Sequence, residues 1–227
     1  PNDYCMSKGW NRADHVADFK EAERKGIRVD IFGKTLIIAG GVVDIEFVRE
    51  YLVNMTIDTI VCADSGLDAA YRLGLPVHYA MGDFDSVSKV ALQHYKEQKE
   101  PVQTKFVSYP PEKDATDSHI VLEWTVEQLP TEITILGATG RRLDHFLANV
   151  NILTKPLAYG ITANIVDRHN KIYLIDHSTV IHKEDMFGKY ISFIPFPEEV
   201  SAVYMRGLKY DLDGQNLTIG DSLGVSN

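Results

Sequence analysis

The stretch TIVCADSGLDAAYRLGLPVHYAMG, residues 59–82, contains two short apolar runs separated by a segment with helical periodicity. The first run, TIVCA, predicts a buried strand, and the loop that follows it leads into an amphipathic helix over LDAAYRL. Gly74 comes directly after this helix, where a glycine in the left-handed conformation ends a helix well. The second run predicts another strand. A strand, a helix and a strand in this order are typical of a parallel sheet, because the helix returns the chain to the same end of the sheet.

The same alternation extends on both sides of this stretch. Further strands are predicted at TLIIAGG (35–41), TKFVSYP (104–110) and TEITILGATG (131–140). Further helices are predicted at DIEFVREYLV (44–53), VSKVALQHYKEQ (87–98), DSHIVLEWTVEQL (117–129) and LDHFLANVNILTKPL (143–157). We therefore expect residues 35–158 to form an α/β domain of three layers, in which helices cover both faces of a parallel sheet.

Residues 159–227 have a different pattern. Their apolar runs, such as YISFIPF and VSAVYM, are short, rich in β-branched and aromatic residues, and separated by turn signals such as Asp213-Gly214. No helical periodicity is present, so we expect a second, all-β domain, a sandwich or small barrel. Residues 1–34 fit neither pattern and are treated as an N-terminal extension of unknown role.

Composition and motifs exclude several classes of function. The chain has 32 acidic and 23 basic residues and a net charge of −9, which disfavours nucleic acids and anionic membranes as main partners. Cys5 and Cys62 make no disulfide framework, and no apolar segment resembles a membrane span or signal peptide, so we expect a cytoplasmic protein. The sequence has no H-E-x-x-H, G-x-S-x-G or Walker motif, which argues against a zinc enzyme, a serine hydrolase and a P-loop enzyme.

Polar residues follow the predicted strands of the first domain. Asp83 and Asp85 in GDFDS come directly after a strand, and two carboxylates on one side of an extended chain suggest a divalent cation between them. The alternative is a solvated turn that caps the helix beginning near Ser86. Asp114 and Asp117 of KDATD follow another strand, with Thr116 as a candidate helix cap. Because parallel strands end at one edge, we expect these acids to share that edge, which favours a metal–phosphate site.

The segment GATGRRLDH, residues 137–145, follows the last predicted parallel strand and leads into a helix. A glycine-rich turn at a helix N-terminus offers backbone N–H groups to an anion, and guanidinium groups such as those of Arg141 and Arg142 bind phosphate bidentately. The segment is a poor match to a dinucleotide-binding loop, since Leu143 stands where a glycine is needed. Asp144 either orients an arginine or bonds a ribose or base, or it occupies a first-turn position that the helix dipole favours. His145 is a candidate ligand contact.

Together, CADSG, GDFDS, KDATD, GATGRRLDHFLAN, GLKYDL and SLGVSN resemble the motifs of bacterial thiamine pyrophosphokinases, in order from about Thr35 to Asn227. The resemblance implies an N-terminal α/β nucleotide-binding domain, a C-terminal β-sandwich that binds thiamine, and a homodimer. It also implies the transfer of pyrophosphate from ATP to thiamine with release of AMP, and a requirement for Mg²⁺. One departure is Arg141, where the family often has glycine.

The resemblance also implies roles for individual residues. Asp83, Asp85 and Asp117 match the metal-binding and catalytic carboxylates of the family, and Tyr210, Ser226 and Asn227 match its thiamine site. The predicted ATP- and phosphate-binding residues are Asp64, Ser65, Gly66, Lys113, Thr116, Gly137, Gly140, Arg141, Arg142, Asp144 and His145. Two other interpretations stay open: another metal-dependent hydrolase or phosphoryl or nucleotidyl transferase, and a nucleotide- or thiamine-sensing module without turnover.

Overall fold

The computed structural model describes residues 32–108 and 115–227, so Lys113 and Asp114 and nearly all of the N-terminal extension lie outside the described residues. The chain divides into two compact units, one ending at Thr179 and the other comprising Val180–Asn227. Among the described residues, no helix is both long enough and apolar enough to cross a membrane.

In the first unit, seven strands of the described chain form one sheet in the order β4-β3-β2-β1-β5-β6-β7. All neighbouring strands in it are parallel except the last pair, in which β7 runs antiparallel to β6. The strands are β1 (Lys34–Ile38), β2 (Thr59–Ala63), β3 (Tyr79–Gly82), β4 (Lys105–Ser108), β5 (Glu132–Leu136), β6 (Thr162–Val166) and β7 (Lys171–Ile172). The predicted parallel sheet is confirmed.

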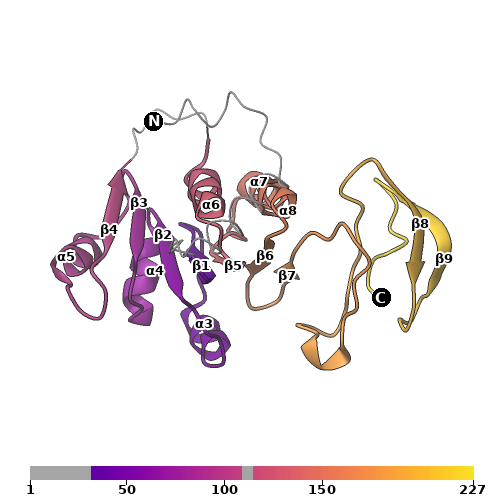
Figure 1. The fold of residues 1–227 in the computed structure, drawn as a ribbon, viewed down its shortest axis with the longest axis horizontal. Helices are drawn as coiled ribbons and strands as arrows, with labels where there is room; N and C mark the ends of the chain where they lie inside the picture. Colours follow the sequence, from indigo (N-terminus) through magenta and orange to yellow (C-terminus); the bar gives the residue numbers. More distant parts are fainter. Residues whose placement is uncertain (1–31, 109–114) are drawn as a thin grey trace, which may run out of the picture. The chain divides into compact units, whose positions relative to one another are not determined.

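Helices cover both faces of this sheet, as Figure 1 shows. One layer contains α3 (Ile45–Leu52), α4 (Gly66–Leu73) and α5 (Lys89–Glu97). The other contains α6 (Asp117–Glu127), α7 (Leu143–Ile152) and the short α8 (Thr154–Ala158). Gly74 ends α4 in the left-handed conformation, with φ 69°, as its position in the sequence predicts.

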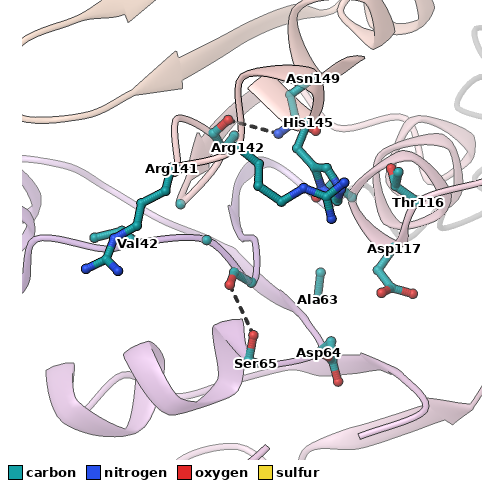
Figure 2. A pocket seen from close by; sticks show the side chains of 16 residues that line it. Val42, Ala63, Asp64, Ser65, Thr116, Asp117, Arg141, Arg142, His145 and Asn149 are labelled. Carbon is teal, nitrogen blue, oxygen red and sulfur yellow. Dashed lines mark hydrogen bonds between the residues drawn. The ribbon is translucent and has the colours of Figure 1, made fainter. Parts of the chain in front are cut away.

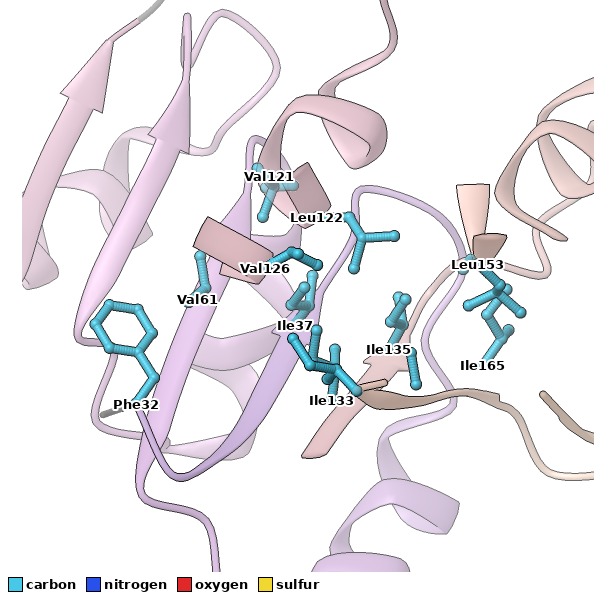
Figure 3. Close-up of a cluster of buried hydrophobic side chains, with 14 of the residues drawn as sticks. Phe32, Ile37, Val61, Val121, Leu122, Val126, Ile133, Ile135, Leu153 and Ile165 are labelled. Atoms are coloured by element: carbon cyan, nitrogen blue, oxygen red, sulfur yellow. The ribbon is translucent and has the colours of Figure 1, made fainter. Parts of the chain in front are cut away.

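The main hydrophobic core lies between the sheet and the α6 layer (Figure 3). Ile37, Val61 and Ile133 project from the sheet, and Val121 and Leu122 of α6 pack over them. These side chains are almost completely buried. Since each such burial contributes about 1.5–3 kcal/mol, this layer holds the strand ends in fixed positions.

The strand order creates a crevice at the centre of the sheet. β1 lies between β2 and β5, with Ile38 opposite Cys62 on one side and opposite Leu136 on the other. The chain leaves β1 toward β2, whereas β5 and β6 extend the sheet in the opposite direction. After β1 and β5 the chain therefore continues in different directions, to α3 in one helix layer and to α7 in the other. Ligands of open α/β sheets bind at such a point.

The first unit extends further along the chain than the predicted boundary between residues 158 and 159. Residues 162–166 form β6, which pairs with β5 through Ile133 and Ala163, and β7 continues the same sheet. The sequence misplaces the boundary because a short β-branched run looks the same in a parallel sheet and in a sandwich. Only the pairing partner distinguishes the two.

The second unit is antiparallel β structure. β8 (Glu199–Met205) and β9 (Leu212–Thr218) form a two-stranded sheet with an irregular register, and η1 (Lys183–Asp185) is a 3₁₀ turn. Met205, Leu212 and Leu217 form its small core. The predicted all-β character is confirmed, but the described residues of this unit contain one regular sheet instead of the two of a sandwich. YISFIPF forms no regular strand, since Pro195 and the following Pro197 lack the N–H groups that a ladder requires.

Candidate active site

A pocket of about 560 Å³ lies at the carboxyl edge of the sheet, where the loops after β1 and β5 diverge (Figure 2). The ends of three strands (β1, β2 and β5), the N-cap of α4, and residues of α6 and α7 line it. The lining residues are Gly40, Gly41, Val42, Ala63, Asp64, Ser65, Thr116, Asp117, Ser118, Gly137, Ala138, Gly140, Arg141, Arg142, His145 and Asn149. Nine of these belong to the predicted ATP-binding and catalytic set, so the structure brings most of that set together.

Two glycine loops form one wall of the pocket, and their backbones lie in direct contact. The Gly41 N–H donates to the Gly137 carbonyl at 3.1 Å, and a Cβ atom at Gly41 would lie 2.1 Å from that oxygen. Gly137 has φ +71°, and its own Cβ would approach the Ala39 carbonyl to 2.6 Å. Only glycine allows this spacing, and the absence of side chains leaves backbone N–H groups accessible to an anion.

The N-termini of α4, α6 and α7 all meet the pocket through lining residues. The N-cap of α6 is Thr116, whose hydroxyl accepts from the His119 N–H at 3.3 Å, as predicted. The N-caps of the other two helices, Ser65 and Arg142, make no side-chain cap bond. The positive ends of helix dipoles attract anions, so this convergence suits a polyphosphate.

Arginine provides positive charge at this edge. Arg142 is held by Asp144 in a bidentate ion pair, with Nη2–Oδ2 at 2.6 Å and Nε–Oδ1 at 3.2 Å. The hydrogen bond from Arg142 lowers the pKa of Asp144, so this carboxylate stays charged and keeps the guanidinium in place. Asp144 itself does not line the pocket. Arg141 makes no hydrogen bond or ion pair within the described part of the chain, and Figure 2 shows it on the side of Val42.

Asp64 lies at the opposite side of the pocket from Arg142 (Figure 2). Its backbone has φ 44°, and its carboxylate accepts a hydrogen bond from the Ser86 hydroxyl through Oδ2. The other oxygen, Oδ1, is buried and has no hydrogen-bond partner among the described residues. A buried carboxylate oxygen without a partner is costly, which indicates that a ligand group satisfies it.

The loop that carries Asp83 and Asp85 adjoins the pocket without lining it. A Cβ at Gly82 would lie 3.2 Å from the Cα of Asp64, so the start of this loop packs against that residue. The chain is not extended here: Phe84 has φ 65°, and Asp83 Oδ1 accepts from the Asp85 N–H at 3.1 Å. The alternative of a helix cap is also wrong. α5 begins at Lys89, and the capping side chain is that of Ser88, which accepts from the Ala91 N–H.

The residues at this edge fit Mg²⁺. Within residues 32–108 and 115–227, no three His, Cys, Asp or Glu side chains gather as a preformed metal cage. Mg²⁺ in nucleotide enzymes is usually held by one or two carboxylates together with substrate phosphates, so such a cage is not required. The orphaned Asp64 Oδ1, and the exposed carboxylates of Asp83 and Asp85 on the adjoining loop, supply the hard oxygen ligands that this ion prefers.

Gly66 has a structural explanation. It does not line the pocket, and a Cβ on it would lie 2.0 Å from the Ile38 carbonyl, so its role is to let α4 pack against β1.

The sequence prediction missed Asn149, which is buried on α7 and donates to the Ala138 carbonyl at 2.9 Å. The signal for Asn149 is its spacing, four residues after His145 on the same helix face.

In the second unit, the structure brings Tyr210 and Asn227 together. The Asn227 side chain accepts from the Tyr210 N–H and donates to the Tyr210 carbonyl, both at 2.7 Å. Backbone bonds between Ile191 and Asn227, at 2.8 and 3.1 Å, fix the end of the chain. Ser226 has φ 60°, and its N–H donates to the Ser192 hydroxyl. The Tyr210 ring is about half exposed, with the Lys209 ammonium 5.0 Å from its centre.

Comparison with known families agrees with this two-part architecture. Residues 51–165 match the family model of the thiamin pyrophosphokinase catalytic domain, and residues 177–227 match that of the thiamin pyrophosphokinase vitamin B1 binding domain. The chain belongs to the thiamin pyrophosphokinase family. The catalytic match extends to residue 165 and therefore includes nearly all of β6, in agreement with the structural boundary.

Individual members of the family are similar to the chain over most of its length. Thiamine pyrophosphokinase from Bacillus subtilis is 34% identical over 169 residues, which cover 74% of this chain and 73% of that protein. A crystal structure of the Bacillus subtilis enzyme superposes with a TM-score of 0.74 at 30% identity, covering 86% of this chain and 88% of that one. The thiamin pyrophosphokinase structure from Geobacillus thermodenitrificans gives a TM-score of 0.65, also at 30% identity, over 82% and 84% of the two chains.

Proposed function

We propose that this protein is a thiamine pyrophosphokinase, which transfers pyrophosphate from ATP to the hydroxyethyl group of thiamine and releases AMP. The observation that carries the proposal is the pocket at the switch point of the sheet. Its glycine loops, helix N-termini and Arg142 are suited to a polyphosphate, and it lies within the segment that matches the family's catalytic domain.

The nucleotide occupies the pocket with its phosphates toward the glycine loops. Backbone N–H groups and the Arg142 guanidinium neutralise the phosphate oxygens, and the ion pair with Asp144 keeps the guanidinium oriented before the substrate arrives. Because phosphoryl-type transfer depends mostly on positioning and on charge stabilisation, this preorganisation is the main contribution of the pocket to the rate.

The carboxylates act at the reacting end of the nucleotide. Asp83, Asp85 and Asp117 would hold Mg²⁺, which would supply positive charge for the phosphates. One of the same three carboxylates accepts the proton of the thiamine hydroxyl as its oxygen attacks the β-phosphorus. Asp64 adjoins this loop: its Oδ2 accepts from the Ser86 hydroxyl, and its Oδ1 would be a further oxygen ligand for the ion.

The second unit supplies the contacts to thiamine. Its segment matches the family's vitamin B1 binding domain, and the half-exposed ring of Tyr210 offers a face on which an aromatic, cationic ring can stack. The Asn227 side chain uses both of its polar atoms to hold the Tyr210 backbone, so its contribution is to position that ring.

A homodimer and a cytoplasmic location belong to the same proposal. Large apolar side chains are exposed over the second unit, among them those of Ile194, Tyr204 and Ile219, and a surface of this kind is commonly buried against a second copy. Light scattering on the purified protein tests the assembly, and a monomer at micromolar concentration would refute it. Cell fractionation tests the location.

The activity is tested by incubating the protein with thiamine, ATP and Mg²⁺ and identifying all products by chromatography. The proposal predicts thiamine diphosphate and AMP in equal amounts, both dependent on thiamine. ADP or inorganic phosphate as the nucleotide-derived product would favour a hydrolase or a different transferase. Tight binding of ATP and thiamine without any product would favour a sensing module.

A further inference from the structure

The turn between β6 and β7 contacts both glycine loops of the pocket. Arg168 of this turn forms a bidentate ion pair with Asp44, with Nε–Oδ2 at 2.5 Å and Nη2–Oδ1 at 2.9 Å. Asp44 follows Gly41 by three residues, at the end of the first glycine loop. Arg168 also lies over the Phe47 ring, 5.9 Å from its centre. The turn is thus held by an ion pair and a ring contact against the segment that leads from β1 into α3.

Asp167, the neighbouring residue of the turn, lies beside the second glycine loop. Thr139, between Gly137 and Gly140, lines the same cavity as Asp167, and its hydroxyl contributes to lowering the pKa of the Asp167 carboxylate. Asp167 also accepts from the backbone N–H groups of His169 and Asn170, both at 2.7 Å. Burial raises the pKa of Asp167, but these hydrogen bonds outweigh it and lower the pKa overall, so the carboxylate stays charged. Residues 167 and 168 therefore belong to one hydrogen-bonded turn, which is ion-paired to the first loop and lies beside the second.

The two glycine loops border open space on this side as well. A second cavity of about 190 Å³ is lined both by loop residues, Val42, Gly137 and Thr139, and by the turn residues Asp167 and Arg168. Val42 and Gly137 line both cavities and so form the partition between them. A partition with open space on both sides can shift unless polar contacts hold it.

We propose that Arg168 and Asp167 are positioning residues that hold the two glycine loops at the spacing required by the nucleotide phosphates. The inference rests on the proposed function, because it assigns the pocket to ATP. Neither residue lines the nucleotide pocket, so both act through the loops. Asp44 has two roles in this arrangement, since it also caps α3 by accepting from the Phe47 N–H at 3.0 Å.

The test is a double-mutant cycle on the ion pair. Arg168→Gln removes the guanidinium, and Asp44→Asn removes the charge while keeping a good helix cap. We expect each single variant to raise the KM for ATP about fivefold, the scale of a partly exposed ion pair, with little change in the KM for thiamine. The double variant should be no worse than either single variant, because both remove the same interaction. Arg49→Gln is the matched control, an equal charge change at an exposed position of α3, and should leave the KM for ATP unchanged.

The KM values of these variants distinguish a positioning role of Arg168 from direct contact between Arg168 and the phosphates. If Arg168 bound the phosphates itself, Asp44→Asn would release it and leave the KM for ATP unchanged or lower it, which would overturn the inference. Hydrogen exchange without nucleotide provides a second measurement: the amides of residues 39–44 and 137–140 should exchange faster in Arg168→Gln than in wild type. Unchanged exchange in both segments would also overturn it. A failure of the proposed function would look different from a failure of this inference. If the proposed function were wrong, wild-type protein would make no thiamine diphosphate. The hydrogen-exchange result would still show whether the turn holds the loops.

Discussion

The Ser86 hydroxyl donates a hydrogen bond to the Asp64 carboxylate and thereby joins the loop after β3 to the pocket at the end of β2. Asp83 and Asp85 precede Ser86 in that loop, so the bond fixes two exposed carboxylates beside the nucleotide pocket. Positive φ angles at Asp64 and Phe84 occur on both sides of this contact. Unusual backbone conformations of this kind cost free energy and tend to occur where function requires them.

Asp83→Asn and Asp85→Asn test the role of this loop. Each change preserves the size of the side chain but removes a charge that, in the proposed function, holds Mg²⁺. We expect kcat to fall by at least about 100-fold, the scale of losing one key electrostatic contact in a transition state. Circular dichroism should show an intact fold, because both side chains are exposed. Near-normal turnover in both variants would leave these residues with only a role in the turn.

Arg142→Ala and Tyr210→Ala should separate the two substrates. Arg142 lines the pocket proposed for the nucleotide, so its loss should raise the KM for ATP by about tenfold, as expected for a charge-assisted hydrogen bond. Tyr210→Ala should instead raise the KM for thiamine and leave that for ATP nearly unchanged. Steady-state kinetics with each substrate varied in turn measures both effects. Unchanged ATP kinetics in Arg142→Ala would refute the phosphate role of the loop.

Gly41→Ala should destabilise the fold through a backbone clash. Its Cβ would lie 2.1 Å from the Gly137 carbonyl, and relieving such a contact typically costs about 1–3 kcal/mol. Gly140→Ala is the matched control, because the nearest atoms to its Cβ are 3.7 Å away, an ordinary contact. Urea unfolding of the two variants gives the difference directly. Equal stability of the variants would contradict the close approach of the loops.

His78 makes stability depend on pH. Its Nδ1 accepts from the Ile60 N–H at 3.1 Å, and burial lowers its pKa below the ordinary value of 6.5. The unfolded chain therefore binds a proton at a higher pH than the folded protein does. The contribution of neutral His78 is fully present above about pH 6.5 and is lost as the pH falls through its folded pKa. His78→Gln, which cannot be protonated, should show a smaller fall in Tm between pH 7 and pH 5 than wild type; an equal fall would exclude His78 as the source.

The sequence predicted the parts of the structure that depend on local pattern. The alternation of apolar runs and amphipathic segments was sufficient for five parallel strands and their helices, and strand ends alone placed Asp64 and Arg142 at one edge. The loop geometry was not predictable in this way. Phe84 has a positive φ, and the nearby Ser86 bonds to Asp64, a contact between residues 22 positions apart that local pattern does not show.

The position at which the first unit ends could not be predicted from local sequence pattern either. Residues 162–166 have the composition of a strand in either unit, and their assignment follows from pairing with β5. The second glycine loop illustrates the same limit. GATG indicates a turn that can bind an anion, but the proposed role of Asp167 follows only from its position beside Thr139 in the folded chain.

The most direct test of the proposed activity is a single-turnover experiment with the protein in excess over ATP labelled at the γ-phosphate, in the presence of thiamine and Mg²⁺. The proposal predicts that the label moves from ATP into thiamine diphosphate in one phase, with AMP appearing at the same rate and no ADP or thiamine monophosphate as an intermediate. Label in inorganic phosphate, or ADP formed before any thiamine diphosphate, would contradict it.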